Sequence, residues 1–175
     1  MLQPPEVIAT ISALRSVRNP RLLATERGFQ GAFYGALCTA LQCQRLRQDG
    51  RIVEMEYQKS ARHHLSQRPD IIYHIPADVS HPSVKDGNFA VWALKYMGSA
   101  RVVEKDLRKL DQMCRVLDYR LALFVNVSSS KTHLDAYVGR FRDRLHAFAV
   151  PGVRGSSITH SYFSQGCLTE VHLPL

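Results

Sequence analysis

The sequence predicts a mixed α/β fold (α+β), in which a central sheet of about four core strands is flanked by helices. Three patterns lead to this class. Long segments carry apolar residues at helical spacing, short segments alternate or are wholly apolar as strands are, and one helical segment separates two apolar strands, as in a parallel crossover. With 175 residues, 45% hydrophobic and 22% charged, the chain suits one globular domain.

The first part of the chain is expected to be helical. Apolar residues recur at helical spacing over residues 5–18, and Asn19-Pro20 ends this segment and can begin the next. A second amphipathic helix is expected from Arg21 or Glu26 to Arg47, because its apolar residues again form one stripe.

Three short strands are expected next. Residues 52–59 alternate between apolar and polar, and residues 70–75 form a short apolar run that Pro76 closes. Residues 89–96 are almost wholly apolar, as in a central strand that is covered on both faces. Consecutive strands of this kind favour an antiparallel meander.

The second half of the chain continues the same layout. A helix over 101–117 leads to an apolar strand over 121–127, which indicates a parallel crossover. A further helix is expected over 132–148. The tail, residues 158–173, is expected to form a hairpin that turns near Gly166.

We expect one domain, made of a helical extension (1–25), a core (26–130) and a C-terminal helix and hairpin (131–175). Charged residues interrupt every apolar run before the ~18 residues of a membrane span, so no membrane association is expected. The chain does not open with a basic and then apolar secretory pattern, which favours a cytoplasmic protein.

The charge balance indicates a polyanionic partner. The chain has 23 Lys and Arg against 15 Asp and Glu, a formal net charge of +8, and 17 of the basic residues are Arg. Because Arg binds phosphate with a planar fork of donors, nucleic acid is the expected partner. A basic surface that binds nothing explains the charge equally well.

Three charged residues occupy unusual positions. Glu26 precedes Phe29 by three residues and therefore lies on the stripe by which its helix packs, so it faces the core or a cleft. Asp70 directly follows Pro69 at the start of a strand, and Lys95 lies near the end of the third strand. Each has an ordinary reading, as a helix-start acid, a turn residue or a surface lysine.

Together these residues resemble the PD-(D/E)xK superfamily of nucleases, to which restriction endonucleases and Holliday-junction resolvases belong. The resemblance covers about residues 26–127, including the order of elements. It implies a restriction-endonuclease-like core and an endonuclease that hydrolyses DNA phosphodiester bonds with Mg²⁺ or Mn²⁺. It assigns Asp70 to metal binding, Lys95 to activation of water, and Glu26 to the metal site or its support.

The sequence departs from this pattern at one position. The residue two before Lys95 is Ala93, where the resemblance implies an acid that binds metal. Three explanations stay open. The acid has been replaced by engineering, or it has been relocated to Glu104 on the following helix or to Glu54 or Glu56 on the neighbouring strand, or the chain is an inactive nuclease-like module that binds nucleic acid or a partner protein.

Basic residues next to this constellation are candidates for phosphate binding. A solvated charged loop is the ordinary alternative for the connection before Asp70. Because the chain lacks a separate recognition domain, a homodimer or a partner protein is also considered. The candidate nucleic-acid contacts are Arg62, His63, His64, Arg68 and Arg101.

Overall fold

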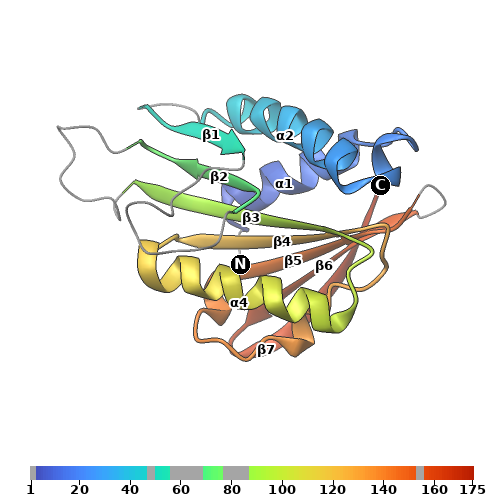
Figure 1. Ribbon diagram of the computed structural model, residues 1–175. Helices are drawn as coiled ribbons and strands as arrows, with labels where there is room; N and C mark the ends of the chain where they lie inside the picture. Colours follow the sequence, from blue (N-terminus) through green and yellow to red (C-terminus); the bar gives the residue numbers. More distant parts are fainter. Residues whose placement is uncertain (1–2, 47–49, 56–68, 77–86, 153–155) are drawn as a thin grey trace.

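The computed structural model describes residues 3–46, 50–55, 69–76, 87–152 and 156–175, and these form three layers. A single seven-stranded mixed sheet lies in the middle, with α1 (Pro5–Ser16) and α2 (Glu26–Cys43) on one face and α4 (Ala100–Leu117) on the other (Figure 1). The mixed α/β class is therefore confirmed. Within the described ranges, no helix is long and apolar enough to cross a membrane.

The strands lie in the sheet in the same order as in the chain. The two central pairings, β3 with β4 and β4 with β5, are parallel, and the four others are antiparallel. The expectation of about four core strands was too low, because the C-terminal strands extend the same sheet. The strands are β1 (Ile52–Met55), β2 (Ile71–His74), β3 (Asn88–Tyr96), β4 (Leu121–Val127), β5 (Leu145–Val150), β6 (Ser157–Ser164) and β7 (Cys167–Pro174).

The start of α2 is set by a local cap. The Thr25 hydroxyl accepts a hydrogen bond from the Gly28 backbone N–H at 3.1 Å, which satisfies one of the free donors of the first turn. A single 3₁₀ turn, η1 (Leu22–Ala24), precedes this cap. The second helix therefore begins at Glu26 rather than Arg21, and Glu26 lies in its first turn.

The helix expected over 132–148 is wrong. This segment holds two 3₁₀ turns, η2 (Leu134–Ala136) and η3 (Arg142–Arg144), and then β5. Between the turns the chain passes so close to α4 that a Cβ on Gly139 would lie 2.2 Å from Asp111 Oδ1. All six residues of β5 are buried, and such a run shows no alternation that separates a strand from a helix.

The predicted terminal hairpin is confirmed. Strands β6 and β7 pair in full register, from Ser157 opposite Pro174 to Ser164 opposite Cys167. Gln165 and Gly166 connect them with φ values of 51° and 80°. Two central residues with positive φ define the type I′ turn, whose twist matches that of the strands.

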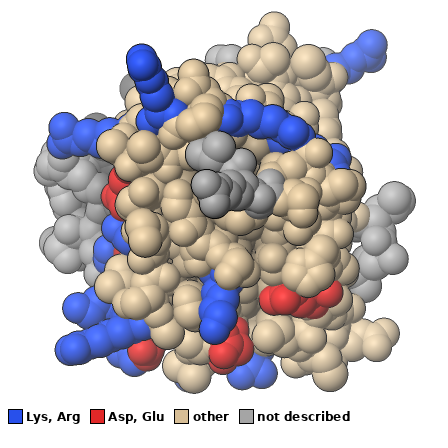
Figure 2. All heavy atoms as spheres, turned by 90° about the vertical axis from the view of Figure 1, so that its right-hand side faces the viewer, with Lys and Arg blue, Asp and Glu red and all other residues tan. Residues whose placement is uncertain are grey.

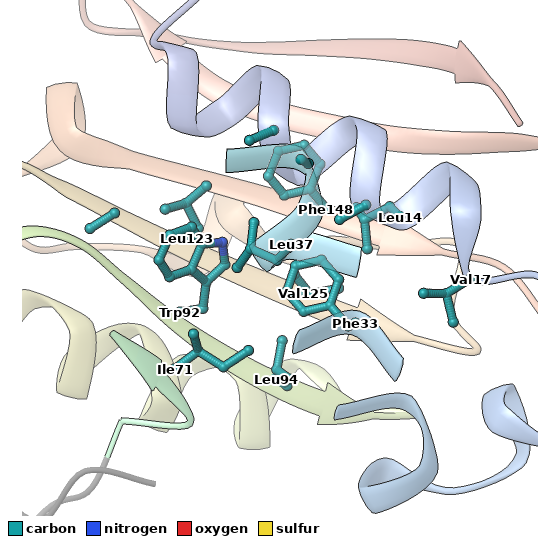
Figure 3. Close-up of a cluster of buried hydrophobic side chains, with 14 of the residues drawn as sticks. Leu14, Val17, Phe33, Leu37, Ile71, Trp92, Leu94, Leu123, Val125 and Phe148 are labelled. Atoms are coloured by element: carbon teal, nitrogen blue, oxygen red, sulfur yellow. The ribbon is translucent and has the colours of Figure 1, made fainter. Parts of the chain in front are cut away.

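Alternate residues of β3 pack into opposite layers. Trp92 and Leu94 face α1 and α2, whereas Val91 and Ala93 face α4. Figure 3 shows Trp92 among the apolar side chains of the first layer. Its indole N–H donates to the Thr10 hydroxyl of α1 at 3.0 Å, and both residues are fully buried. This bond attaches α1 to the middle of the sheet.

Candidate functional site

Antiparallel pairing of β2 with β3 brings Asp70 to the carboxyl end of β3. Ile71 lies opposite Trp92, and the Asp70 N–H donates to the Trp92 carbonyl at 3.2 Å. The Asp70 carboxylate in turn accepts a hydrogen bond from the Leu94 backbone N–H at 2.6 Å. Asp70 is thus fixed beside the strand that carries Lys95.

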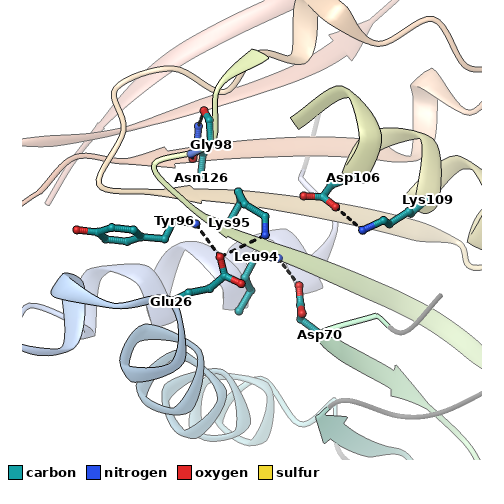
Figure 4. A network of polar contacts seen from close by, with 9 residues as sticks. All are labelled: Glu26, Asp70, Leu94, Lys95, Tyr96, Gly98, Asp106, Lys109 and Asn126. Atoms are coloured by element: carbon teal, nitrogen blue, oxygen red, sulfur yellow. Dashed lines mark hydrogen bonds and ion pairs between the residues drawn. The ribbon is translucent and has the colours of Figure 1, made fainter. Parts of the chain in front are cut away.

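Glu26 reaches the same end of β3 from the start of α2. Its Oε2 lies 3.3 Å from Lys95 Nζ and accepts a hydrogen bond from the Tyr96 N–H at 3.2 Å. Figure 4 shows the Glu26 and Asp70 carboxylates approaching β3 from different elements. The structure therefore brings together the three residues singled out in the sequence.

The loop after β3 packs tightly against Lys95. The Asn126 side chain accepts a hydrogen bond from Gly98 N–H at 2.8 Å and donates to the carbonyls of Gly98 and Lys131 at 3.1 and 2.9 Å. A Cβ at position 98 would lie 2.7 Å from Lys95 Cγ, so glycine permits this approach. The loop and Glu26 together restrict the position of the Lys95 side chain.

A solvent-open hollow of about 410 Å³ lies between this end of the sheet and α4. We call it the β3 hollow. Asp70, Ala93 and Lys95 line it from the sheet side, and Asp106 and Lys109 line it from α4. Glu26 is not among its lining residues and meets it only through Lys95.

Asp106 was not among the candidates from the sequence. It is only 6% exposed, and its Oδ1 lies 2.8 Å from Lys109 Nζ. Its Oδ2 is buried without a hydrogen-bond partner among the described residues. A signal existed, because Asp106 lies three residues after Val103 and four before Leu110 on the apolar stripe of α4. The same reasoning had selected Glu26.

Burial and neighbouring charges perturb Asp70. Desolvation is the largest cause that raises its pKa, to about 6, and the negative charges of Glu26 and Asp106 add to it. The Leu94 N–H and the Lys95 charge act in the opposite direction. An ionised Asp70 is therefore costly in this hollow, and a cation close to it would reduce the cost.

The relocated acids proposed from the sequence lie elsewhere where they are described. Glu104 pairs with Arg108 at 2.5 Å and lines a different hollow, between α4 and the chain around Tyr137. Glu54 pairs with His74 at 2.6 Å. Ala93 does line the β3 hollow, with its methyl group 8% exposed.

The candidate nucleic-acid contacts are only partly covered. Arg101 is exposed at the start of α4. Glu56 and four of the five basic candidates, Arg62, His63, His64 and Arg68, lie outside the described residues. Figure 2 views the end of the molecule where β3 passes to α4, and shows Lys and Arg side chains spread around its rim with fewer acidic ones.

Within the part of the chain that the structure describes, no three His, Cys, Asp or Glu side chains form a group that could hold a metal. The β3 hollow offers two carboxylates, from Asp70 and Asp106. This number suits Mg²⁺, which proteins usually hold through one or two carboxylates, with water and substrate phosphate completing the shell.

Comparisons with known proteins gave no match. No family model, curated protein or solved structure is significantly similar to this chain. The site is therefore interpreted from its own geometry.

Proposed function

We propose that the protein is a metal-dependent nuclease that hydrolyses phosphodiester bonds in DNA. One observation carries the proposal: Asp70 and Lys95, which come from different strands, line the same solvent-open hollow, and Glu26 pairs with Lys95 beside it. A carboxylate and an ammonium group at one opening are the minimum that metal-assisted hydrolysis of a phosphodiester needs from the protein.

The hollow fits a divalent cation such as Mg²⁺ or Mn²⁺. The buried, unpartnered Oδ2 of Asp106 and the raised pKa of Asp70 both indicate negative charge that is not fully compensated. When bound, the ion would neutralise phosphate charge and favour ionisation of a water molecule. Asp70 would hold it, because its carboxylate is fixed at the hollow by Leu94.

Lys95 would act on the reacting groups. Its ammonium can donate hydrogen bonds to a phosphate oxygen or to the attacking water, and thereby stabilise negative charge that develops there. Glu26 is better suited to position Lys95 than to bind metal, because its Oε2 already contacts both Lys95 and the Tyr96 N–H.

Nucleic acid fits the charge of the chain. The net charge is +8. Arg27 and Arg101 are exposed at the starts of α2 and α4, the helices that supply Glu26 and Asp106. Such side chains would hold phosphates on either side of the hollow and align the backbone of the substrate.

The direct test is cleavage of supercoiled plasmid and single-stranded DNA with Mg²⁺ or Mn²⁺, with EDTA as the blank. We expect metal-dependent cleavage, and a rate at least about 100-fold lower for Lys95→Ala. The matched control is Lys105→Ala, an exposed lysine of α4, which should keep the rate within about twofold. Metal-independent or absent cleavage by the wild-type chain contradicts the proposal.

A second candidate function is a nuclease-like module that binds nucleic acid or a partner protein without cutting. Ala93 favours it, because the acid implied by the resemblance is missing there. Fluorescence anisotropy with labelled DNA separates the two functions. Binding that needs no divalent ion, together with no cleavage by either the wild type or Ala93→Glu, supports the inactive module.

A further inference from the structure

Asp106 is a charged residue in an apolar position. Its neighbours on the α4 stripe, Val103, Leu107 and Leu110, are all at most 2% exposed. Aspartate is rarely buried in this way unless its oxygens are paired. Lys109 compensates only Oδ1, while Oδ2 stays buried without a partner among the described residues. A buried carboxylate oxygen without a partner is costly, so a ligand that binds it is favoured.

The unpaired oxygen belongs to a residue that faces Asp70 across the β3 hollow. Both residues line it, and the charge of Asp106 is one of the causes that raise the pKa of Asp70. The two lysines of the hollow are already engaged, Lys95 with Glu26 and Lys109 with Asp106. The hollow therefore keeps an excess of negative charge, which suits a cation.

Ala93 explains why α4 can supply this group. It lies on the α4-facing side of β3, packs in the same layer as Val103 and Leu107, and lines the hollow. A longer acidic side chain at position 93 would project into the space in front of Asp106. A small residue on the strand and an acid on the helix are thus complementary.

We infer that Asp106 and Asp70 together form a divalent-cation site, in which Asp106 supplies the carboxylate that position 93 lacks. This inference rests on the proposed function for its biological use, but the cation site itself can be tested without any substrate. It also replaces Glu104, Glu54 and Glu56 as the source of the second acid.

The test is calorimetric titration with Mn²⁺ alone at pH 7.5, checked by the shift in melting temperature that Mn²⁺ causes. Wild type should bind one ion, and Asp106→Asn should bind at least about tenfold more weakly. The matched control is Glu104→Gln, two residues away on α4 but paired with Arg108 outside the hollow, which should bind within about twofold of wild type.

A charge swap makes the test specific. In Asp106→Asn/Ala93→Glu the carboxylate is moved from helix to strand, and we expect it to recover most of the Mn²⁺ affinity that Asp106→Asn loses. Circular dichroism and melting without metal establish that each variant is folded. If the swap variant does not fold, the single variant and its Glu104→Gln control still decide.

Failure of this inference can be told from failure of the proposed function. Wild type that binds no Mn²⁺, or Asp106→Asn that binds as wild type does, overturns the cation site, even if the chain cuts DNA. Mn²⁺ binding that depends on both Asp70 and Asp106, in a chain that cuts no nucleic acid, supports the cation site and contradicts the nuclease.

Discussion

At the scale of single residues, the β3 hollow holds Asp70 in an unfavourable state for a charged group. The Leu94 N–H stabilises its carboxylate, yet burial dominates and raises its pKa to about 6. Asp106 adds a second buried carboxylate with an unpartnered oxygen. Residues that reduce stability in this way are typical of functional sites, where ligand binding offsets their cost.

Replacing Asp70 by Asn should therefore stabilise the metal-free protein. The Asn side-chain oxygen can still accept from Leu94 N–H, but no charge is buried. We expect the free energy of unfolding at pH 7.5 to rise by about 1 to 2 kcal/mol in urea denaturation with EDTA present. The exposed Asp135→Asn should change it by less than about 0.5 kcal/mol. A destabilised Asp70→Asn variant would mean that its carboxylate has a structural role.

The bond between Thr10 and Trp92 gives a second prediction at this scale. Thr10→Val keeps the shape of the side chain but leaves the buried indole N–H of Trp92 without its acceptor. We expect a loss of about 1 to 3 kcal/mol in the free energy of unfolding. Thr39→Val, on the exposed side of α2, is the comparison and should cost much less. Equal losses for the two variants would show that the indole bond is not the cause.

At the scale of elements, patterns within one segment were enough for α1, α2, α4 and the terminal hairpin. Helical stripes and the Gly166 turn are local signals, and each element lies close to where it was expected. The strand β5 was missed because both of its faces are buried, which removes the alternation. Its pairing with β6, which joins the hairpin to the sheet, is a contact between distant segments that no local pattern encodes.

The site was predictable to the same extent. Glu26, Asp70 and Lys95 stood out because each breaks a local pattern at the edge of an apolar element. Asp106 also breaks one, but Lys105, Arg108 and Lys109 surround it and give the segment the look of a solvated face. That Asp70 and Asp106 share one hollow follows only from the packing of α4 on the sheet.

The β5–β6 pair also predicts a dependence of stability on pH. His146 and His160 are buried with 2.9 Å between Nδ1 and Nε2, next to Phe148 and Tyr162. Burial lowers the pKa of His146 to about 4 and that of His160 to about 3. Below the ordinary pKa of about 6.5 the unfolded chain therefore binds more protons than the folded one, and stability falls as pH decreases.

The measurement is urea denaturation at pH 7.5 and pH 5. His160→Phe should lose less stability than wild type between these values, by about 1 to 2 kcal/mol, because one of the two linked protons is removed. Asp70 acts in the opposite direction between about pH 6 and 3.8, but it does so in both proteins and cancels in the comparison. An identical pH dependence in the two proteins contradicts the prediction.

At the scale of the whole molecule, one continuous sheet joins the three parts expected from the sequence, residues 1–25, 26–130 and 131–175. Trp92 is the only tryptophan, lies in the middle of this sheet and is bonded to α1. Its fluorescence should therefore change together with far-UV circular dichroism in a single transition with urea. Two separate midpoints would show that one of the parts unfolds independently.

The order of the strands has a consequence for the birth of the protein. Because spatial order equals chain order, every new strand finds its neighbour already synthesised when it leaves the ribosome. Glu26, Asp70, Lys95 and Asp106 all precede β4, so the elements that assemble the β3 hollow are complete once residue 127 has emerged. The last three strands then only widen a sheet whose proposed cation pocket can form during translation.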